Sequence, residues 1–250
     1  MPVRKVLILG GTAEAAALAA ELLARAGERI DLVSSFAGRV EGLRPPPGKV
    51  RIGGFGGADG LAAYIRDEAI DLLVDATHPF ADRMSRNARE AAERTGIPRL
   101  LYWRPSWPRH PLDRWIEVDG IDAAAHALRH LGHRVWLTVG GTELAAFAQV
   151  QDRWFLVRVI DAARTPPPFA ECTVIEGRGP FSLENERALI RHHRIEVVVS
   201  KASGGPATYA KIEAAREADL PVVMVRRPLP EPGDQVETVT DAVTWVMSRV

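Results

Sequence analysis

Short apolar runs alternate with longer amphipathic stretches through the first part of the chain, and this alternation constrains the fold more than any other feature. The predicted strands are 5–9, 30–33, 50–52, 72–74 and 99–102. The predicted helices are 13–25, 59–68 and 79–95, the last beginning at Pro79 with Thr77 or His78 as its cap. Strands separated by helices form a parallel sheet that is covered on both faces. We therefore predict a doubly wound α/β unit of the Rossmann-like or flavodoxin-like kind.

A second series of strands and helices repeats the first. VLILGGTAE at 6–14 resembles VWLTVGGTE at 135–143, and two later pairs of segments recur at similar offsets. The predicted strands are 134–139, 154–159, 197–200 and 222–225, and the predicted helices are 123–130, 182–192 and 206–218. The repeat predicts two domains, residues 1–103 and 104–250, joined by a stiff proline-rich segment and facing each other across a cleft. The pattern does not assign the C-terminal helix to either domain.

Composition excludes several classes of function. Lys and Arg number 32 and Asp and Glu also number 32, so no overall field attracts nucleic acid or a membrane surface. The single Cys172 rules out an internal disulfide framework and a multi-cysteine metal site. His126, His130 and His133 have no carboxylate in a metal-binding pattern, so no metal site is predicted. The N-terminal apolar run is too short for an export signal, and we expect a cytoplasmic protein.

The turn after the first predicted strand, GGTAEA, is the first candidate ligand site. Adjacent Gly10 and Gly11 allow a sharp turn, and Thr12 can cap the following helix, which begins at Ala13 and Glu14. A capped helix N-terminus behind a glycine turn suits a phosphate. The alternative is a tight strand-to-helix turn that needs glycine only for its own geometry.

Three further loops favour a dinucleotide. Ser34 and Ser35, followed by Arg39, suit the 2′-phosphate of NADPH better than the ribose of NADH, unless Arg39 is only a solvated loop residue. The GGFGG segment carries Gly54, Phe55 and Gly56, which can pack against a ring or a ribose. The DATHPFA segment carries Thr77, His78 and Pro79. His78 could donate a proton or only hydrogen-bond a carboxamide.

The second half has a different set of polar loop residues, suited to a ligand with several carboxylates. Lys201 and Lys211 lie in VSKASGGPATYAKI, and Arg178 lies between two glycines in GRGPFSLENE. The predicted substrate-binding residues are Arg104, Thr138, Gly140, Gly141, Arg178, Lys201, Ser203, Gly204, Thr208, Tyr209 and Lys211.

Taken together, GGTAEA, DATHPFA, TVGGTEL, GRGPFSLENE and SKASGGPATYAKIEAA, followed by PVVMVRRP, closely resemble the precorrin-6A reductases of cobalamin biosynthesis. The resemblance runs from about residue 4 to residue 230. It implies NADPH-dependent reduction of one double bond of precorrin-6A, giving precorrin-6B, with cofactor and tetrapyrrole between two Rossmann-like domains. Other enzymes of the same pathway are the expected partners.

Several alternatives stay open at this point. The macrocycle could arrive metal-free or carrying cobalt, which would make the protein a cobalt-precorrin-6A reductase. The proton that accompanies the hydride could come from His78, Lys201, Tyr209 or water, and Lys201 and His78 are the candidate catalytic residues. From other classes, a nucleotide-dependent transferase or a non-catalytic two-lobed binding protein could use the same fold.

Overall fold

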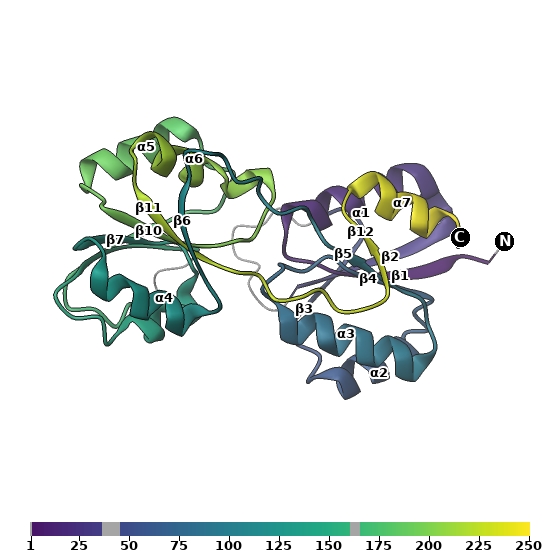
Figure 1. Ribbon diagram of the computed structural model, residues 1–250. Helices are drawn as coiled ribbons and strands as arrows, with labels where there is room; N and C mark the ends of the chain where they lie inside the picture. The colour runs from purple at the N-terminus through teal and green to yellow at the C-terminus, as the bar shows by residue number, and fades with distance from the viewer. Residues whose placement is uncertain (1, 37–45, 161–165) are drawn as a thin grey trace. The chain divides into compact units, whose positions relative to one another are not determined.

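The computed structural model describes residues 2–36, 46–160 and 166–250 (Figure 1). The chain forms two compact units. The first comprises Met1–Pro105 together with Pro228–Val250, and the second comprises Ser106–Arg227. Each unit contains one six-stranded sheet, and every strand pairing is parallel.

The first unit has the strand order of a Rossmann fold. Its sheet runs β3-β2-β1-β4-β5-β12, which is the 3-2-1-4-5-6 order and not the flavodoxin order. The strands are β1 (Arg4–Leu9), β2 (Ile30–Phe36), β3 (Lys49–Ile52), β4 (Leu72–Asp75), β5 (Arg99–Tyr102) and β12 (Asp234–Val236). The helices are α1 (Ala13–Ala26), α2 (Ala58–Asp67), α3 (Asp82–Thr95) and α7 (Val239–Met247), with a 3₁₀ turn at Gly27–Arg29.

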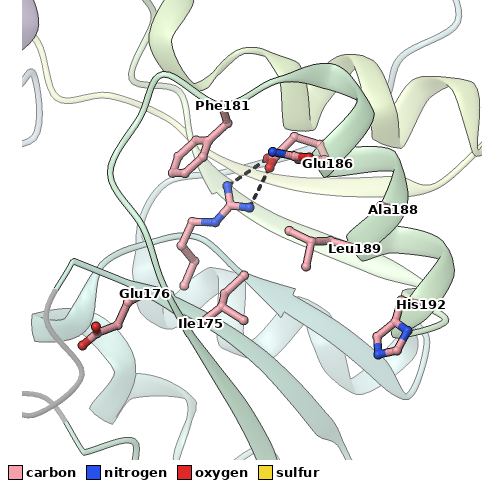
Figure 2. A pocket seen from close by; sticks show the side chains of 9 residues that line it. Ile175, Glu176, Phe181, Glu186, Ala188, Leu189 and His192 are labelled. Atoms are coloured by element: carbon pink, nitrogen blue, oxygen red, sulfur yellow. Dashed lines mark hydrogen bonds and ion pairs between the residues drawn. The ribbon is translucent and has the colours of Figure 1, made fainter.

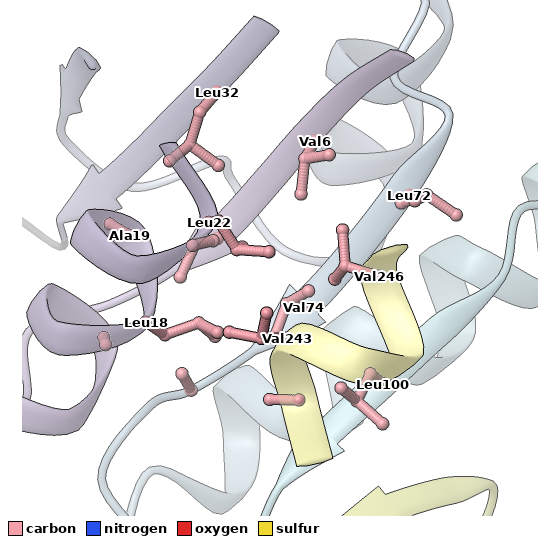
Figure 3. Close-up of a cluster of buried hydrophobic side chains, with 14 of the residues drawn as sticks. Val6, Leu18, Ala19, Leu22, Leu32, Leu72, Val74, Leu100, Val243 and Val246 are labelled. Atoms are coloured by element: carbon pink, nitrogen blue, oxygen red, sulfur yellow. The ribbon is translucent and has the colours of Figure 1, made fainter. Parts of the chain in front are cut away.

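The sheet is buried on both faces, which explains why its strands read as continuous apolar runs. Val6 and Ile8 pack beneath α1 and α7 (Figure 3), whereas Leu7 and Leu9 pack against α2 and α3. All four side chains are at most 2% exposed. The predicted strands and helices of this half are present, with ends that differ by a few residues.

The C-terminal segment belongs to the first unit, although the predicted boundary assigned residues 104–250 to the second. Strand β12 pairs with β5, and α7 buries Ala242, Val243 and Val246 completely. These side chains join those of α1 in one hydrophobic cluster (Figure 3). The apolar stripe of α7 therefore covers sheet surface that α1 leaves open, and this burial decides where the segment folds.

The second unit repeats the same strand order with a different source for its sixth strand. Its sheet runs β9-β8-β7-β10-β11-β6, and β6 comes from the beginning of the unit, not from its end. The strands are β6 (Arg114–Val118), β7 (Arg134–Leu137), β8 (Trp154–Val159), β9 (Cys172–Glu176), β10 (Val197–Lys201) and β11 (Pro221–Val225). The helices are α4 (Ile121–Ala127), α5 (Leu183–His192) and α6 (Ala210–Glu217), with 3₁₀ segments at Leu128–His130, Gly141–Phe147 and Pro206–Thr208.

Two local differences from the predicted elements affect the site. Helix α3 begins at Asp82 and not at Pro79, and its N-cap residue is Ala81, because hydrogen bonds of the preceding loop hold residues 77–81 in separate turns. In the second unit the repeated glycine turn leads into a short 3₁₀ segment, whereas its counterpart in the first unit leads into the 14-residue helix α1. None of the helices in the described ranges combines the length and hydropathy needed to cross a bilayer.

Candidate active site

The glycine turn of the first unit lies between the carboxyl ends of β1 and β4, where the strand order reverses. Thr12 caps α1, because its hydroxyl accepts a hydrogen bond from the Ala15 N–H at 3.1 Å. The same hydroxyl donates to the Ala76 carbonyl at 2.9 Å and so ties the turn to the neighbouring strand. This edge is the usual ligand position in an open parallel sheet.

The turn leaves room beside its second glycine. Gly11 has φ +110°, and a Cβ atom built on it would meet none of the described atoms within 4 Å. The N–H groups of the first helical turn have no partners within the helix, and the helix dipole makes this end positive. The predicted Gly10–Glu14 segment therefore has the geometry of an anion site, which needs an open approach and unpaired donors.

An ion pair stands beside the start of α1. Arg104, which follows β5, donates two hydrogen bonds to the Glu14 carboxylate at 2.9 and 3.0 Å. Both side chains are mostly buried, at 12% and 14% exposure. The predicted substrate-binding Arg104 is thus held in the first unit, at the predicted cofactor edge, where it neutralises Glu14 next to the anion site.

The loop after β4 is organised by a buried carboxylate. Asp75 is fully buried, and its Oδ1 accepts hydrogen bonds from the Thr77 N–H at 3.2 Å and the Thr77 hydroxyl at 2.7 Å. Its Oδ2 has no hydrogen-bond partner among the described residues. The Phe80 N–H donates to His78 Nδ1 at 3.3 Å, so in the neutral imidazole the proton is on Nε2. Asp75 is not among the predicted site residues, although its place as the last residue of an apolar strand was the available signal.

The second strand is longer than predicted, and this changes the position of its serines. Ser34 and Ser35 lie inside β2, not at its end, and are 2% and 5% exposed. Successive side chains of a strand point to opposite faces, so the two hydroxyls cannot face one ligand group together. Ser34 Oγ is buried without a hydrogen-bond partner in the described part of the chain. Arg39 lies outside the described residues.

The GGFGG loop is shaped by Arg51, which is not among the predicted site residues. Arg51 of β3 donates to the Gly53 carbonyl at 2.6 Å and the Gly54 carbonyl at 3.0 Å. Its guanidinium lies 3.8 Å from the centre of the Phe55 ring. The loop is therefore fixed by contacts within the protein, and a cation two residues before a glycine-rich segment was the signal for it.

In the second unit, a lysine and a glutamate meet at the carboxyl ends of β7 and β10. Lys201 Nζ donates to both oxygens of the Glu143 carboxylate, at 2.8 and 2.9 Å. Thr138 ties the same two strands together, because its hydroxyl donates to the Val199 carbonyl at 2.9 Å. Glu143 follows the repeated Gly140-Gly141 turn as Glu14 follows the first, and each glutamate pairs with a cation. That repeat was the available signal for Glu143.

The remaining predicted residues of the 199–212 segment divide into two groups. Ser203 and Gly204 follow Lys201 directly, and the Ser203 N–H donates to the Lys201 carbonyl at 2.7 Å. Lys211, by contrast, is only 5% exposed, and its ammonium donates to the Thr208 carbonyl at 2.9 Å. The Tyr209 hydroxyl accepts a hydrogen bond from Arg216 at 2.7 Å. The polar atoms of Lys211, which is buried, and of Tyr209, which is half-buried, are therefore engaged within the unit.

Arg178 lies in the loop after β9, at the same sheet edge. It is half-buried between Gly177 and Gly179. The next residues of the loop contact the 204–208 turn, since the Phe181 N–H donates to the Ala207 carbonyl at 3.1 Å. Two of the predicted substrate segments are thus in contact with one another.

Two parallel sheets in Rossmann order, each with a glycine turn and an acid–base pair at its carboxyl edge, place the protein in the class of two-domain Rossmann-like α/β proteins. The model of the family described as precorrin-6x reductase CbiJ/CobK matches residues 5–247. A precorrin-6A reductase of Rhodococcus erythropolis is 49% identical over 97% of both chains. A solved structure, CobK precorrin-6A reductase, has a TM-score of 0.92 at 36% identity and covers 98% of this chain and 97% of that one. A cobalt-precorrin-6A reductase of Priestia megaterium is 29% identical over 98% of both chains.

The chain belongs to the precorrin-6x reductase CbiJ/CobK family. It is therefore an oxidoreductase of cobalamin biosynthesis that acts on a CH–CH group, and the predicted fold class and family are confirmed.

Proposed function

We propose that this protein reduces one double bond of the precorrin-6A macrocycle with NADPH, giving precorrin-6B. The observation that carries the proposal is the capped N-terminus of α1 behind an open glycine turn, in a chain that is 49% identical to a precorrin-6A reductase. A reductase needs a hydride source, and a dinucleotide pyrophosphate suits this helix end.

The residues of the first unit fit such a cofactor. Gly11 and the first-turn amides of Ala13 and Glu14 would hold the pyrophosphate, with Thr12 fixing the helix end. Gly10 would line the turn without donating, because its N–H is bonded to the Ser35 carbonyl at 2.9 Å. The Thr77–Pro79 loop lies beside this turn through the Thr12–Ala76 hydrogen bond and would contact the nicotinamide end. Ser34 Oγ, buried without a described partner, would gain one from a ribose or from a bound water. NADPH, when bound, supplies the hydride.

The choice of NADPH over NADH is assigned to Arg39 on the basis of its place in the sequence, and Ser35 and the Gly54–Gly56 loop are assigned to the same cofactor. Arg39→Ala should weaken NADPH binding by about 1.5–3 kcal/mol, the range for a hydrogen bond to a charged group, and leave NADH binding unchanged. Titration calorimetry with both cofactors measures the difference. Equal losses for both would show that Arg39 does not bind the 2′-phosphate.

The second unit is proposed to bind the tetrapyrrole, whose acidic side chains need cations and N–H donors. Its 3₁₀ segment after Gly141 is too short to repeat the helix dipole of α1, so the unit is less suited to a pyrophosphate. Lys201 and Arg178 are the proposed carboxylate partners, supported by Thr138, Gly140, Gly141, Ser203, Gly204 and Thr208. We assign Lys211 and Tyr209 a structural role instead, because their polar atoms are engaged within the unit.

Reduction of a carbon–carbon double bond adds a hydride to one atom and a proton to its neighbour. Two side chains at the sheet edges are the proposed proton donors: His78 through Nε2 when its ring is protonated, and the Lys201 ammonium through Nζ. The His78 ring is oriented by the Phe80 N–H, and the Lys201 ammonium is oriented by Glu143. Substitution by alanine of whichever residue donates the proton should lower kcat, while the KM values for NADPH and the tetrapyrrole stay unchanged.

A metal-free macrocycle is the proposed substrate. The relative named for the metal-free substrate shares 49% identity, whereas the one named for the cobalt substrate shares 29%. Parallel assays with precorrin-6A and cobalt-precorrin-6A should give a higher kcat/KM with the metal-free ring. A higher kcat/KM with the cobalt form would reverse this assignment.

Binding experiments separate this function from its rivals. Calorimetry should detect binding of NADPH and no binding of nucleotide sugars or S-adenosylmethionine. Tighter binding of either of those ligands than of NADPH would support a transferase and contradict the reductase proposal. Binding of NADPH without turnover of either tetrapyrrole would support a non-catalytic binding protein.

A further inference from the structure

A buried ion pair lies next to the loop that carries Arg178. Arg158 of β8 and Glu186 of α5 share two hydrogen bonds of 2.7 and 2.8 Å. Their side chains are 8% and 1% exposed. The pair lines a cavity of about 580 Å³ between β9 and α5, and Figure 2 shows Phe181 and Glu186 at the same end of it. A buried ion pair adds little net stability compared with apolar side chains of similar volume, so its presence here asks for another role.

Arg158 also holds the aromatic side chain of the loop. Its guanidinium carbon lies 4.0 Å from the centre of the Phe181 ring and 4.7 Å from that of Trp136. A planar cation stacks well on such rings, and its position is fixed by the two bonds to Glu186. Phe181 is therefore held between the ion pair and its own backbone bond to Ala207.

The glycines on both sides of Arg178 are closely packed. A Cβ on Gly177 would lie 3.1 Å from the Phe181 ring, and a Cβ on Gly179 would lie 2.7 Å from the Ala207 carbonyl oxygen. Real Cβ atoms essentially never show the second distance. The backbone before Arg178 thus rests on Phe181, and the backbone after it rests on the 204–208 turn.

We propose that the Arg158–Glu186 pair is a positioning device that fixes the 177–181 loop and so orients Arg178 toward a carboxylate of the tetrapyrrole. Arg158 itself does not bind substrate in this account, because both of its terminal nitrogens are bonded to Glu186. The tetrapyrrole as ligand rests on the proposed function, whereas the choice of Arg158 and Glu186 rests on their contacts with the loop.

The test replaces both charges by apolar side chains of similar length. Arg158→Met with Glu186→Leu leaves no buried charge unpaired, so the variant should fold with a melting temperature near that of the wild type. Its KM for the tetrapyrrole should rise about tenfold, with kcat and the KM for NADPH unchanged, because one substrate contact is misplaced. The matched control is Arg187→Met with Glu217→Leu. This pair joins α5 to α6 at about 40% exposure, and its removal should change none of these values.

A double-mutant cycle shows whether the pair acts through Arg178. Arg178→Ala alone should raise the tetrapyrrole KM, and adding Arg158→Met with Glu186→Leu to it should raise the KM no further. Additive effects, or no KM change on removing the pair, would overturn the proposal.

Proteolysis supplies a readout that does not depend on activity. Trypsin cleaves after arginine, and the Arg178–Gly179 bond lies in the loop that the pair is proposed to fix. Cleavage at this bond, followed by mass spectrometry, should be slow in the wild type and in the Arg187/Glu217 control, and several-fold faster in the Arg158/Glu186 variant. Unchanged cleavage would contradict the positioning role even if the wild type reduced precorrin-6A. Faster cleavage in an enzyme without that activity would leave the loop mechanism intact and reject the substrate.

Discussion

The substitution Gly11→Ala tests whether Gly11 is needed for NADPH binding in addition to the stability of the fold. Gly11 has φ +110°, a value that residues other than glycine rarely adopt. The substitution should cost about 1–3 kcal/mol of unfolding free energy as backbone strain. Steric conflict adds nothing, because no described atom lies within 4 Å of the new Cβ.

Gly11→Ala should also weaken NADPH binding, which a loss of stability alone does not explain. If the turn changes conformation to relieve the strain, its N–H groups no longer point at the pyrophosphate. One lost hydrogen bond to a charged group costs about 1.5–3 kcal/mol of binding free energy. The dissociation constant for NADPH should therefore rise roughly 10- to 150-fold. Fluorescence titration measures binding, and thermal unfolding measures the strain.

Gly27→Ala is the matched control for this prediction. Gly27 caps the other end of α1, has φ +55°, and likewise has no described atom within 4 Å of a built Cβ. The Gly27→Ala variant should lose a similar amount of unfolding free energy to Gly11→Ala and bind NADPH as tightly as the wild type. Equal NADPH losses in the two variants would refute the placement of the pyrophosphate at Gly11.

Three further predictions test the roles of other groups. Lys201→Ala should raise the tetrapyrrole KM or lower kcat, whereas Lys211→Ala should leave both KM values and kcat unchanged and cost about 1.5–3 kcal/mol of unfolding free energy by removing a buried charged hydrogen bond. Unchanged kinetics in Lys201→Ala, or a raised tetrapyrrole KM in Lys211→Ala, would contradict the assignment. Burial, followed by the charges of His192 and Arg134, lowers the pKa of His193, so the unfolded chain binds the proton more readily and stability should fall as the pH drops from about 6.5 toward the lower folded pKa. His193→Gln should flatten this part of the stability–pH curve, and an unchanged slope would show that another group causes it. Burial raises the pKa of the Cys172 thiol, so alkylation at neutral pH should be slower in the folded protein than in urea, and equal rates would contradict the burial of this side chain.

The sequence predicted the central strands of both sheets because these strands are buried on both faces. Three of the four edge strands escaped prediction: β6, β9 and β12. Strands β6 and β12 are exposed along much of their length, β9 is half-buried at four of its five residues, and none of the three has a continuous apolar run. The C-terminal helix α7 could not be placed, because its apolar stripe fits either sheet, and only the packing against α1 decides between them.

The sequence indicates the loops of the candidate site, but it does not indicate which residues of those loops form ion pairs with one another. Glycine turns and caps are local, so Thr12 was identified correctly as the cap of α1. The Arg104–Glu14 pair joins residues 90 positions apart, and the Lys201–Glu143 pair joins residues 58 apart. Only the fold brings such partners together. Burial acts in the same way, since the sequence around Lys211 gives no sign that its ammonium is enclosed.

The central claim is that a hydride passes from NADPH to the macrocycle of precorrin-6A. The direct test uses NADPH carrying deuterium at the transferable position of the nicotinamide, prepared separately on each face of the ring, with mass spectrometry of the tetrapyrrole product. We predict that one of the two preparations transfers a single deuterium to precorrin-6B, while the other gives an unlabelled product of the same reduction. Consumption of NADPH without deuterium in the product from either preparation would contradict the account.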